Sequence, residues 1–540
     1  PHFQLRRFPQ KKKQIVFCSH CGEVASIPLS RHNFTCASCA QKTAISKGIV
    51  QKRACTCPGC KTQVLMRDIR SNGQQLSQQL FALEVLPDGT KERIFKRAED
   101  TDIALYKQAS ELWVSLSKQN GFVPSDLIPE RNRDDRRPIS LGYKRYRDLF
   151  NPRQLLCLSQ LAAAISRVED SQSRELLALA FSDSLASNNM FCFYAFDYGK
   201  LTPLFGLHAY AKAYRPVENN VWGAEYGRGS FSKCFKKMLE GKRYASKPFE
   251  YKYPKNGNTL KKFTGDKITC KLYRRKLPVT FNGNSSALIL NRSSEDLGVI
   301  ATGSIDLIFS DPPYYNNLAY SELSDFYHVW LKRLNLKSYF GNYHKQTPLK
   351  ESLYVSQRNG KAGKTHERFS KSLTCIFSEC HRVLKKNGLL VFTYHHNNSM
   401  AWAALAKALL TSGFHVTNVF PVRSEGQSRF HSDDGNIKWD EVIVCRKRVR
   451  KHLNKFKTID EMFHSIEQQA NHHLKYWRHR LKTARLSFNT CDARSLKSGI
   501  MVKYLSTVVI SKDMDFENFF EKSYSNPKLQ NRAAGRIIKK

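Results

Sequence analysis

Residues 305–314 read Ile-Asp-Leu-Ile-Phe-Ser-Asp-Pro-Pro-Tyr, from Ile305 to Tyr314. The apolar run at 305–310 predicts a buried β-strand, which places Asp311 at the edge where open α/β sheets bind their ligands. Further elements are expected to either side: strands at 277–281, 388–394, 415–422 and 441–446, and helices at 323–334, 370–386 and 400–410. This alternation predicts an α/β fold with a parallel, doubly wound sheet.

The Asp-Pro-Pro-Tyr loop has residue types that suit methylation of an exocyclic amine. Such a nitrogen is a poor nucleophile, but the Asp311 carboxylate and the Pro312 carbonyl can each accept one of its N–H groups and aim its lone pair. Tyr314 offers a ring on which an extruded base can stack. The alternative is a turn that merely ends the strand, because Asp-Pro often initiates turns. The polar residues 315–317 and the aromatic helix that follow favour the catalytic interpretation.

Three segments and the cysteine-rich start of the chain resemble a known family. The segments are 310–331, which begins Ser-Asp-Pro-Pro-Tyr-Tyr-Asn-Asn, 150–156 (Phe-Asn-Pro-Arg-Gln-Leu-Leu) and 382–392 (Arg-Val-Leu-Lys-Lys-Asn-Gly-Leu-Leu-Val-Phe). They are similar to the adenine-specific DNA methylases that contain a zinc ribbon, over most of residues 15–447. The resemblance implies a Rossmann-like methyltransferase sheet and site-specific transfer of a methyl group from S-adenosyl-L-methionine to adenine N6 in DNA, after base flipping.

The same resemblance assigns roles to individual residues. The implied catalytic residues are Asp311, Pro312, Pro313 and Tyr314. The implied cofactor contacts are Asn282, Gly283, Asn284, Ser310 and Asp311, with Asn284 at a position where the family carries an acid.

The Phe-x-Gly-x-Gly loop that binds this cofactor in the family has no counterpart in the chain. The glycine cluster 223–229 does not follow a convincing strand and is expected to be a surface loop. Because the first residue is Pro1, we expect the missing loop in a preceding segment or in a partner subunit. This leaves open that the chain is inactive by itself.

Cysteines are concentrated near the start of the chain. Cys18-x2-Cys21-x14-Cys36-x2-Cys39 has the spacing of a zinc ribbon, in which four thiolates close a structural Zn²⁺ site. Cys57-x2-Cys60 is a third knuckle, which either forms part of a second site or replaces one of the first two pairs. All three pairs are predicted metal ligands.

The charge of the chain points to a polyanionic partner. There are 88 Lys and Arg residues against 46 Asp and Glu residues, a formal net charge of +42. Such a field attracts DNA without reading its sequence. The basic runs 131–147 and 242–276 and the tail after 447 are candidate phosphate contacts. No apolar run is long enough for a membrane span, so we expect a cytoplasmic protein without membrane contacts.

Composition and periodicity divide the chain into five expected parts. They are a zinc-ribbon region (1–70), a mixed connector (71–150), a helical DNA-facing region (151–276), the α/β methyltransferase core (277–447) and a basic helical tail (448–540). His395 and His396 follow a strand and either line the pocket or serve packing. Trp330 and Trp402 are expected in helix cores, and Glu322 and Asp325 on an exposed helix face, although they could instead hold the 316–317 loop.

Two functions other than adenine methylation in DNA fit the same residues. One is methylation of RNA or of another amine, because loops of this type also serve guanine N2. The other is a non-catalytic scaffold subunit that binds DNA through its zinc ribbon and tail.

Overall fold

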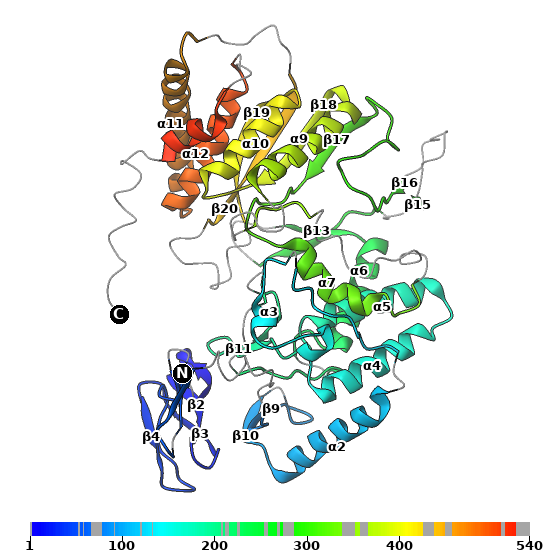
Figure 1. Ribbon diagram of the computed structural model, residues 1–540, viewed down its shortest axis with the longest axis vertical. Coiled ribbons are helices and arrows are strands. Elements are labelled where there is room, and N and C mark those ends of the chain that lie inside the picture. Colours follow the sequence, from blue (N-terminus) through cyan, green and yellow to red (C-terminus); the bar gives the residue numbers. More distant parts are fainter. Residues whose placement is uncertain are drawn as a thin grey trace. The chain divides into compact units, whose positions relative to one another are not determined.

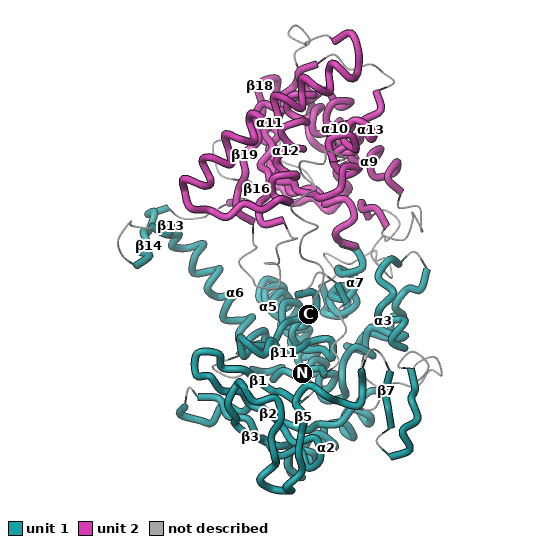
Figure 2. Tube along the Cα trace, turned by 90° about the vertical axis from the view of Figure 1, so that its left-hand side faces the viewer, with its two compact units in different colours: residues 1–269, 320–349 teal, residues 270–319, 350–540 magenta. Residues whose placement is uncertain are grey.

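The computed structural model describes most of the chain. The described residues are 3–51, 54–57, 59–65, 78–90, 92–118, 121–131, 133–206, 209–210, 215–223, 227–252, 258–266, 270–273, 286–336, 352–356, 365–424, 437–448, 456–508 and 514–524. They form two compact units, unit 1 (Pro1–Thr269 and Tyr320–Leu349) and unit 2 (Cys270–Ala319 and Lys350–Lys540), coloured separately in Figure 2. The units do not follow the chain in linear order, and the five-part division stays a prediction.

Unit 1 begins with small antiparallel sheets and continues with helices. Its strands are β1 (Gln4–Phe8), β2 (Lys13–Phe17), β3 (Val24–Pro28), β4 (Asn33–Thr35), β5 (Lys42–Ala44), β6 (Val50–Gln51), β7 (Ala54–Thr56), β8 (Gln63–Leu65), β9 (Ala82–Val85), β10 (Ile94–Arg97), β11 (Phe193–Ala195), β12 (Lys200–Thr202), β13 (Phe249–Lys252) and β14 (Leu260–Phe263). Its helices are η1 (Pro9–Lys11), α2 (Asp100–Ser117), α3 (Arg137–Ser140), η2 (Tyr146–Leu149), α4 (Pro152–Ser166), α5 (Ser171–Leu185), α6 (Phe231–Ser246) and α7 (Tyr320–Leu331).

Helix α4 begins where the Asn-Pro pair predicts. The Asn151 side chain accepts the Gln154 backbone N–H at 2.8 Å, and the Gln154 side chain accepts the Asn151 N–H at 3.0 Å. This reciprocal cap satisfies two N–H groups that a helix otherwise leaves unpaired. The apolar face of α4 then packs with α5 and α7 in one core, where the rings of Phe150 and Phe326 stack at 5.8 Å.

Helix α7 corrects one prediction and confirms another. Trp330 is fully buried, as expected. Glu322 and Asp325 are also fully buried, so their assignment to an exposed face is wrong. The Glu322 carboxylate accepts the backbone N–H groups of Asp134 and, at 2.9 Å, Asp135. The Arg133 guanidinium lies 3.7 Å from it, and burial of this arginine argues against a phosphate contact there.

Unit 2 is an α/β arrangement (Figure 1). Its strands are β15 (Lys271–Tyr273), β16 (Ser286–Leu288), β17 (Ile305–Ser310), β18 (Leu384–Tyr394), β19 (Phe414–Arg423) and β20 (Trp439–Lys447). Its helices are α9 (His366–Val383), α10 (Ser399–Thr411), α11 (Ile459–Thr483), α12 (Thr490–Leu505) and α13 (Phe516–Tyr524). The main sheet has the order β17-β18-β20-β19. The expected strand at 277–281 lies outside the described residues.

The main sheet is mixed, which corrects the prediction of a parallel sheet. β17 and β18 are parallel, but β20 runs antiparallel to both β18 and β19. Periodicity finds a strand without giving its direction, because direction depends on how the connections cross. Strand β17 is also less buried than its apolar sequence predicts, since Leu307 is 54% and Phe309 is 73% exposed. The wider Rossmann-like sheet stays a prediction.

Helices α11, α12 and α13 belong to the core of unit 2. Leu474, Leu496 and Phe519 are buried in the same cluster as Trp402 of α10, which confirms the core position of that tryptophan. α12 contacts β19 and β20, while α13 contacts α10. The stretch after residue 447 is therefore helical, as predicted, but its apolar side chains complete the α/β core. None of the described helices is long and apolar enough to cross a membrane.

Candidate active site

The Asp311 carboxylate lies beyond the carboxyl end of β17. Because β18 runs parallel to β17, with Ser310 paired to Phe392, the next residues of both strands meet at one sheet edge. There the Tyr314 hydroxyl donates to Asp311 Oδ1 at 2.6 Å, and the Thr393 hydroxyl donates to the same oxygen. Asp311 remains exposed to solvent, whereas Pro312 is buried. The carboxylate is thus fixed in direction and still accessible.

The Tyr314 ring is braced by the strand ends around it. Its centroid lies 4.6 Å from that of His395 and 5.7 Å from that of Tyr394. His395 Nδ1 in turn donates to Asp440 of β20. Burial of the phenol, followed by its hydrogen bond to Asp311, raises the pKa of Tyr314 far above its usual value. The hydroxyl therefore stays protonated and serves as a donor.

Tyr315 holds a backbone conformation that a bulky residue rarely adopts. Its φ is +42°, in the left-handed region, which costs about 1–3 kcal/mol unless the surroundings enforce it. The Val355 N–H donates to the Tyr315 carbonyl at 2.8 Å, and the Tyr315 hydroxyl lies 2.9 Å from His366 Nδ1. The ring packs edge-on against Phe369. These contacts hold the loop directly after Tyr314 in one conformation.

His396 continues this support on the other side of the loop. Its side chain is 5% exposed, and its Nδ1 accepts the Asn398 backbone N–H at 2.9 Å. Nε2 therefore carries the proton and donates to Asn316 Oδ1 at 3.1 Å. Burial, with a smaller effect of neighbouring His395, lowers the pKa of His396 to about 4. The imidazole is neutral near pH 7 and has a single tautomer.

The described residues include only some of the predicted site residues. Ser310, Asp311, Pro312, Pro313 and Tyr314 lie together at the end of β17. The predicted cofactor contacts 282–284 lie outside the described residues. The two histidines after β18 both contact the loop: His395 packs against the Tyr314 ring, and buried His396 packs against Tyr315. Packing is thus observed for both, and a role in lining a pocket stays a prediction.

Sequence reasoning missed Thr393, Asp440 and His366. Thr393 is 82 residues from Asp311, and Asp440 is 45 residues from His395. No local pattern marks them, because Thr393 and Asp440 are polar residues of strands whose sheet neighbours the sequence does not give, and His366 begins helix α9. The end of the 388–394 strand was the one available signal for Thr393.

The first four cysteines form a compact group. Their sulfur atoms all lie within 4.8 Å of one another, with Cys18 and Cys39 at 3.6 Å and Cys21 and Cys36 at 3.5 Å. Four thiolates at about 2.3 Å from Zn²⁺ would be separated by about 3.8 Å, so the group fits a tetrahedral zinc ion. The His20 backbone N–H points at Cys18 Sγ, as expected of a thiolate ligand.

The three Cys-x-x-Cys knuckles share one backbone design. In each, the residue after the second cysteine has positive φ and donates its N–H to the carbonyl of the first cysteine; these residues are Gly22, Ala40 and Lys61. Among the described residues, however, Cys57 and Cys60 do not join a group of three or more possible ligands. The third knuckle is built like a metal site, and its ligation stays a prediction.

Two glycines of the 223–229 cluster lie at close contacts. Gly223 and Gly229 both have positive φ. A Cβ on Gly229 would lie 2.0 Å from Ser187 Oγ, and one on Gly223 would lie 2.1 Å from Ser232 Oγ. These two glycines are therefore required by the approach of other chain segments.

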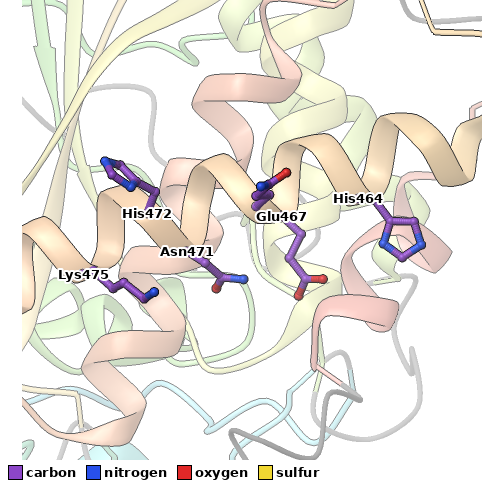
Figure 3. A pocket seen from close by; sticks show the side chains of 6 residues that line it. His464, Glu467, Asn471, His472 and Lys475 are labelled. Carbon is purple, nitrogen blue, oxygen red and sulfur yellow. The ribbon is translucent and has the colours of Figure 1, made fainter.

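Figure 3 shows a pocket on helix α11. It is lined by His464, Glu467, Gln468, Asn471, His472 and Lys475. All six side chains come from this helix, and Glu467 accepts a hydrogen bond from Lys497 at 2.7 Å. None of the Asp311 loop residues lines this pocket, and we assign it no catalytic role.

Comparison with known protein families gives a match over part of the chain. A family model described as DNA methylase matches residues 305–529, which is less than half of the chain. The match includes the Asp311 loop and the main sheet of unit 2, and it supports a DNA methyltransferase of the N6-adenine or N4-cytosine type. It also extends through α11 to α13. No curated protein and no solved structure matches the chain.

Proposed function

We propose that this chain methylates adenine N6 in DNA with S-adenosyl-L-methionine as the methyl donor. The observation that carries the proposal is the accessible Asp311 carboxylate, held by Tyr314 and Thr393 at the end of β17. The DNA methylase match to 305–529 supports the reaction class. The choice of adenine over cytosine rests on the resemblance of the Asp-Pro-Pro-Tyr segment.

The loop can orient an exocyclic amine in the way the reaction requires. Both protein donors use Asp311 Oδ1, and no described residue donates to Oδ2, which is left to accept an N–H of the amine. The Pro312 carbonyl would accept the second N–H. With both hydrogens held, the nitrogen lone pair points in one direction, and this orientation reduces the entropy lost in reaching the transition state.

Tyr314 would hold the extruded base by stacking. Its ring is supported by His395 and Tyr394, so its position is set before the base arrives. Asp311 would remain a hydrogen-bond acceptor throughout, and the amine proton would leave to solvent after transfer.

The residues near Asp311 fit the cofactor. Leu307 and Phe309 occupy alternate positions of β17 and therefore lie on one face, and Asp311 continues this spacing after the strand. Leu307 is 54% and Phe309 is 73% exposed. An exposed apolar surface beside a carboxylate suits a ligand that combines an aromatic ring with a sulfonium cation. When bound, S-adenosyl-L-methionine supplies an electrophilic methyl group. Ser310 and Asp311 would contact it, together with the predicted 282–284 segment.

The product of the reaction tests the proposal. The full chain is incubated with methyl-labelled S-adenosyl-L-methionine and unmethylated duplex DNA, and the digested nucleosides are identified by mass spectrometry. Labelled N6-methyladenine is the expected product. Labelled N4-methylcytosine would show that cytosine is the target base in place of adenine, with the reaction class unchanged. Tight binding of both DNA and S-adenosyl-L-methionine without any label in DNA would favour the alternative of a non-catalytic binding subunit.

A further inference from the structure

The hairpin β13–β14 carries large apolar side chains that face water. It follows helix α6, and Figure 2 shows it at the far end of that helix in unit 1. Tyr251 is 52% exposed, Leu260 57% and Phe263 51%. A two-stranded hairpin is marginally stable alone, and clustered exposed aromatic residues usually mark an interaction surface.

The register divides the hairpin into two different faces. Phe249 pairs with Phe263, and Tyr251 pairs with Lys261, so these four side chains share one face. The Phe249 centroid lies 5.3 Å from Tyr251 and 6.1 Å from Phe263. Glu250, Lys252, Leu260 and Lys262 make up the opposite face.

Two ammonium groups are placed on the rings of the first face. Lys261 Nζ lies 4.3 Å from the Phe249 centroid, and Lys247 Nζ lies 4.6 Å from the Phe263 centroid. We refer to Lys247, Phe249, Tyr251, Lys261 and Phe263 as the aromatic–lysine face. Its cations are held by cation–π contacts rather than by carboxylates, so they can pair with an anion without first breaking an ion pair.

The charge around the hairpin is strongly one-sided. The described residues between 242 and 263 include six cationic side chains: Lys242, Arg243, Lys247, Lys252, Lys261 and Lys262. The one acidic side chain in the same described stretch is Glu250. This balance suits a polyanion, and a two-stranded ribbon has the width to enter a DNA groove.

We propose that the aromatic–lysine face is a DNA-binding arm, which contacts the backbone and a groove of duplex DNA. Lys247 and Lys261 pair with backbone phosphates, while Tyr251 and Phe263 pack against sugars and base edges. The choice of DNA as partner rests on the proposed function. The arm contains no residue of the Asp311 loop, so its contribution to binding is measurable without methyl transfer.

The test is a DNA titration of the full chain followed by fluorescence anisotropy over a range of salt concentrations. We expect Lys247→Gln/Lys261→Gln to weaken duplex binding about tenfold, and to reduce the slope of log K against log salt by about 2. The matched control Lys252→Gln/Lys262→Gln removes the same charge from the opposite face and is expected to change both quantities much less. Tyr251→Ala/Phe263→Ala should weaken binding about tenfold without changing the slope.

Three outcomes would overturn the arm. The first is an unchanged DNA affinity in the Lys247/Lys261 and Tyr251/Phe263 variants. The second is an equal loss of affinity in the Lys252/Lys262 control. The third is a change in binding to anionic phospholipid vesicles without a change in duplex binding. Circular dichroism excludes misfolding as the cause of a loss. If the chain transfers methyl groups but the arm variants bind DNA normally, the proposed function stands and the arm is wrong. If the arm variants lose DNA binding but the chain transfers no methyl group, the arm stands and the proposed function is wrong.

Discussion

Two residues whose rings are in contact, Tyr315 and His396, account for the fixed conformation of the Asp311 loop. Tyr315 has a φ of +42°, and His396 is a buried neutral base with a hydrogen bond at each ring nitrogen. Their rings pack edge-on at 5.6 Å. A strained residue persists only where its neighbours enforce it, so we interpret this pair as the support that keeps Asp311 and Tyr314 in place.

His396 should make the stability of unit 2 depend on pH. Its pKa is about 4 in the folded protein and about 6.5 when unfolded, so between these values the unfolded chain binds the extra proton. Stability is therefore fully present above pH 6.5 and falls as the pH drops toward 4, by up to about 3 kcal/mol. Denaturant unfolding at several pH values measures this, and His396→Asn should flatten the dependence over that window. An equally steep dependence in the variant would contradict the account.

At the residue level, the sequence predicts the position of a segment where the relevant residues are contiguous, while the catalytic role of the segment stays a prediction. Asp311 to Tyr314 are contiguous, and the strand before them fixes their place at a sheet edge. Thr393 and Asp440 reach the same place from other strands, and their roles depend on a strand order that no local pattern contains. The sequence also marks the pair His395 and His396, but the different roles of its members depend on which ring is buried.

Helix α7 shows how a buried charge can fasten one element to another. Glu322 accepts two backbone N–H groups of the 134–135 segment, and Arg133 supplies the compensating charge. Both side chains are completely inaccessible to solvent. Removal of either partner would leave a buried charge without compensation.

We expect Glu322→Ala to destabilise unit 1 by about 3–5 kcal/mol, because Arg133 and two N–H groups lose their partner. Glu322→Gln should cost less, since the amide oxygen still accepts a hydrogen bond. Ser324→Ala, at an exposed position on the same helix, is the control and should change little. Urea unfolding measures all three. A loss below about 1 kcal/mol for the alanine variant would show that the pair contributes little.

The cysteine knuckles predict a defined metal content. Cys36→Ser should abolish zinc binding at the first site and unfold the β4–β5 hairpin, whose strands flank the second knuckle. Metal content by mass spectrometry and near-ultraviolet circular dichroism check this. Cys60→Ser tests whether the third knuckle binds metal: zinc content falls if Cys60 ligates an ion and is unchanged if it does not. Wild-type protein without bound zinc would refute the assignment.

The type of most elements could be predicted from sequence, but their partners could not. The Asn-Pro start of α4, the apolar stripe of α9 and the strands of the main sheet follow from spacing and capping. The antiparallel direction of β20 and the place of α11 to α13 in the core depend on tertiary packing. The basic composition of this stretch concealed apolar faces that pack inward.

At the scale of the whole molecule, the described residues form two large hydrophobic cores, one in each unit. One lies in unit 1 and includes Phe326, and the other lies in unit 2 and includes Trp402. Because each core can lose its packing independently, unfolding should not be two-state.

Calorimetry should resolve two transitions. Phe326→Ala should lower the midpoint of the unit 1 transition, and Trp402→Ala that of the unit 2 transition. Each variant loses about 3–5 kcal/mol of packing free energy. The two variants serve as controls for each other. A single transition that both variants shift equally would show that the units unfold together.

We propose that the Asp311 carboxylate orients the amine for methylation in DNA. The most direct measurement is single-turnover methyl transfer by the full chain with Asp311→Asn, compared with Asp306→Asn in the same strand. Asp306 is exposed and pairs with Lys385, so its variant controls for loss of a surface charge. We predict that Asp311→Asn keeps its fold and DNA affinity and loses about 100-fold or more in rate, while Asp306→Asn transfers normally. Equal rates in the two variants, with labelled DNA formed by both, would contradict the account.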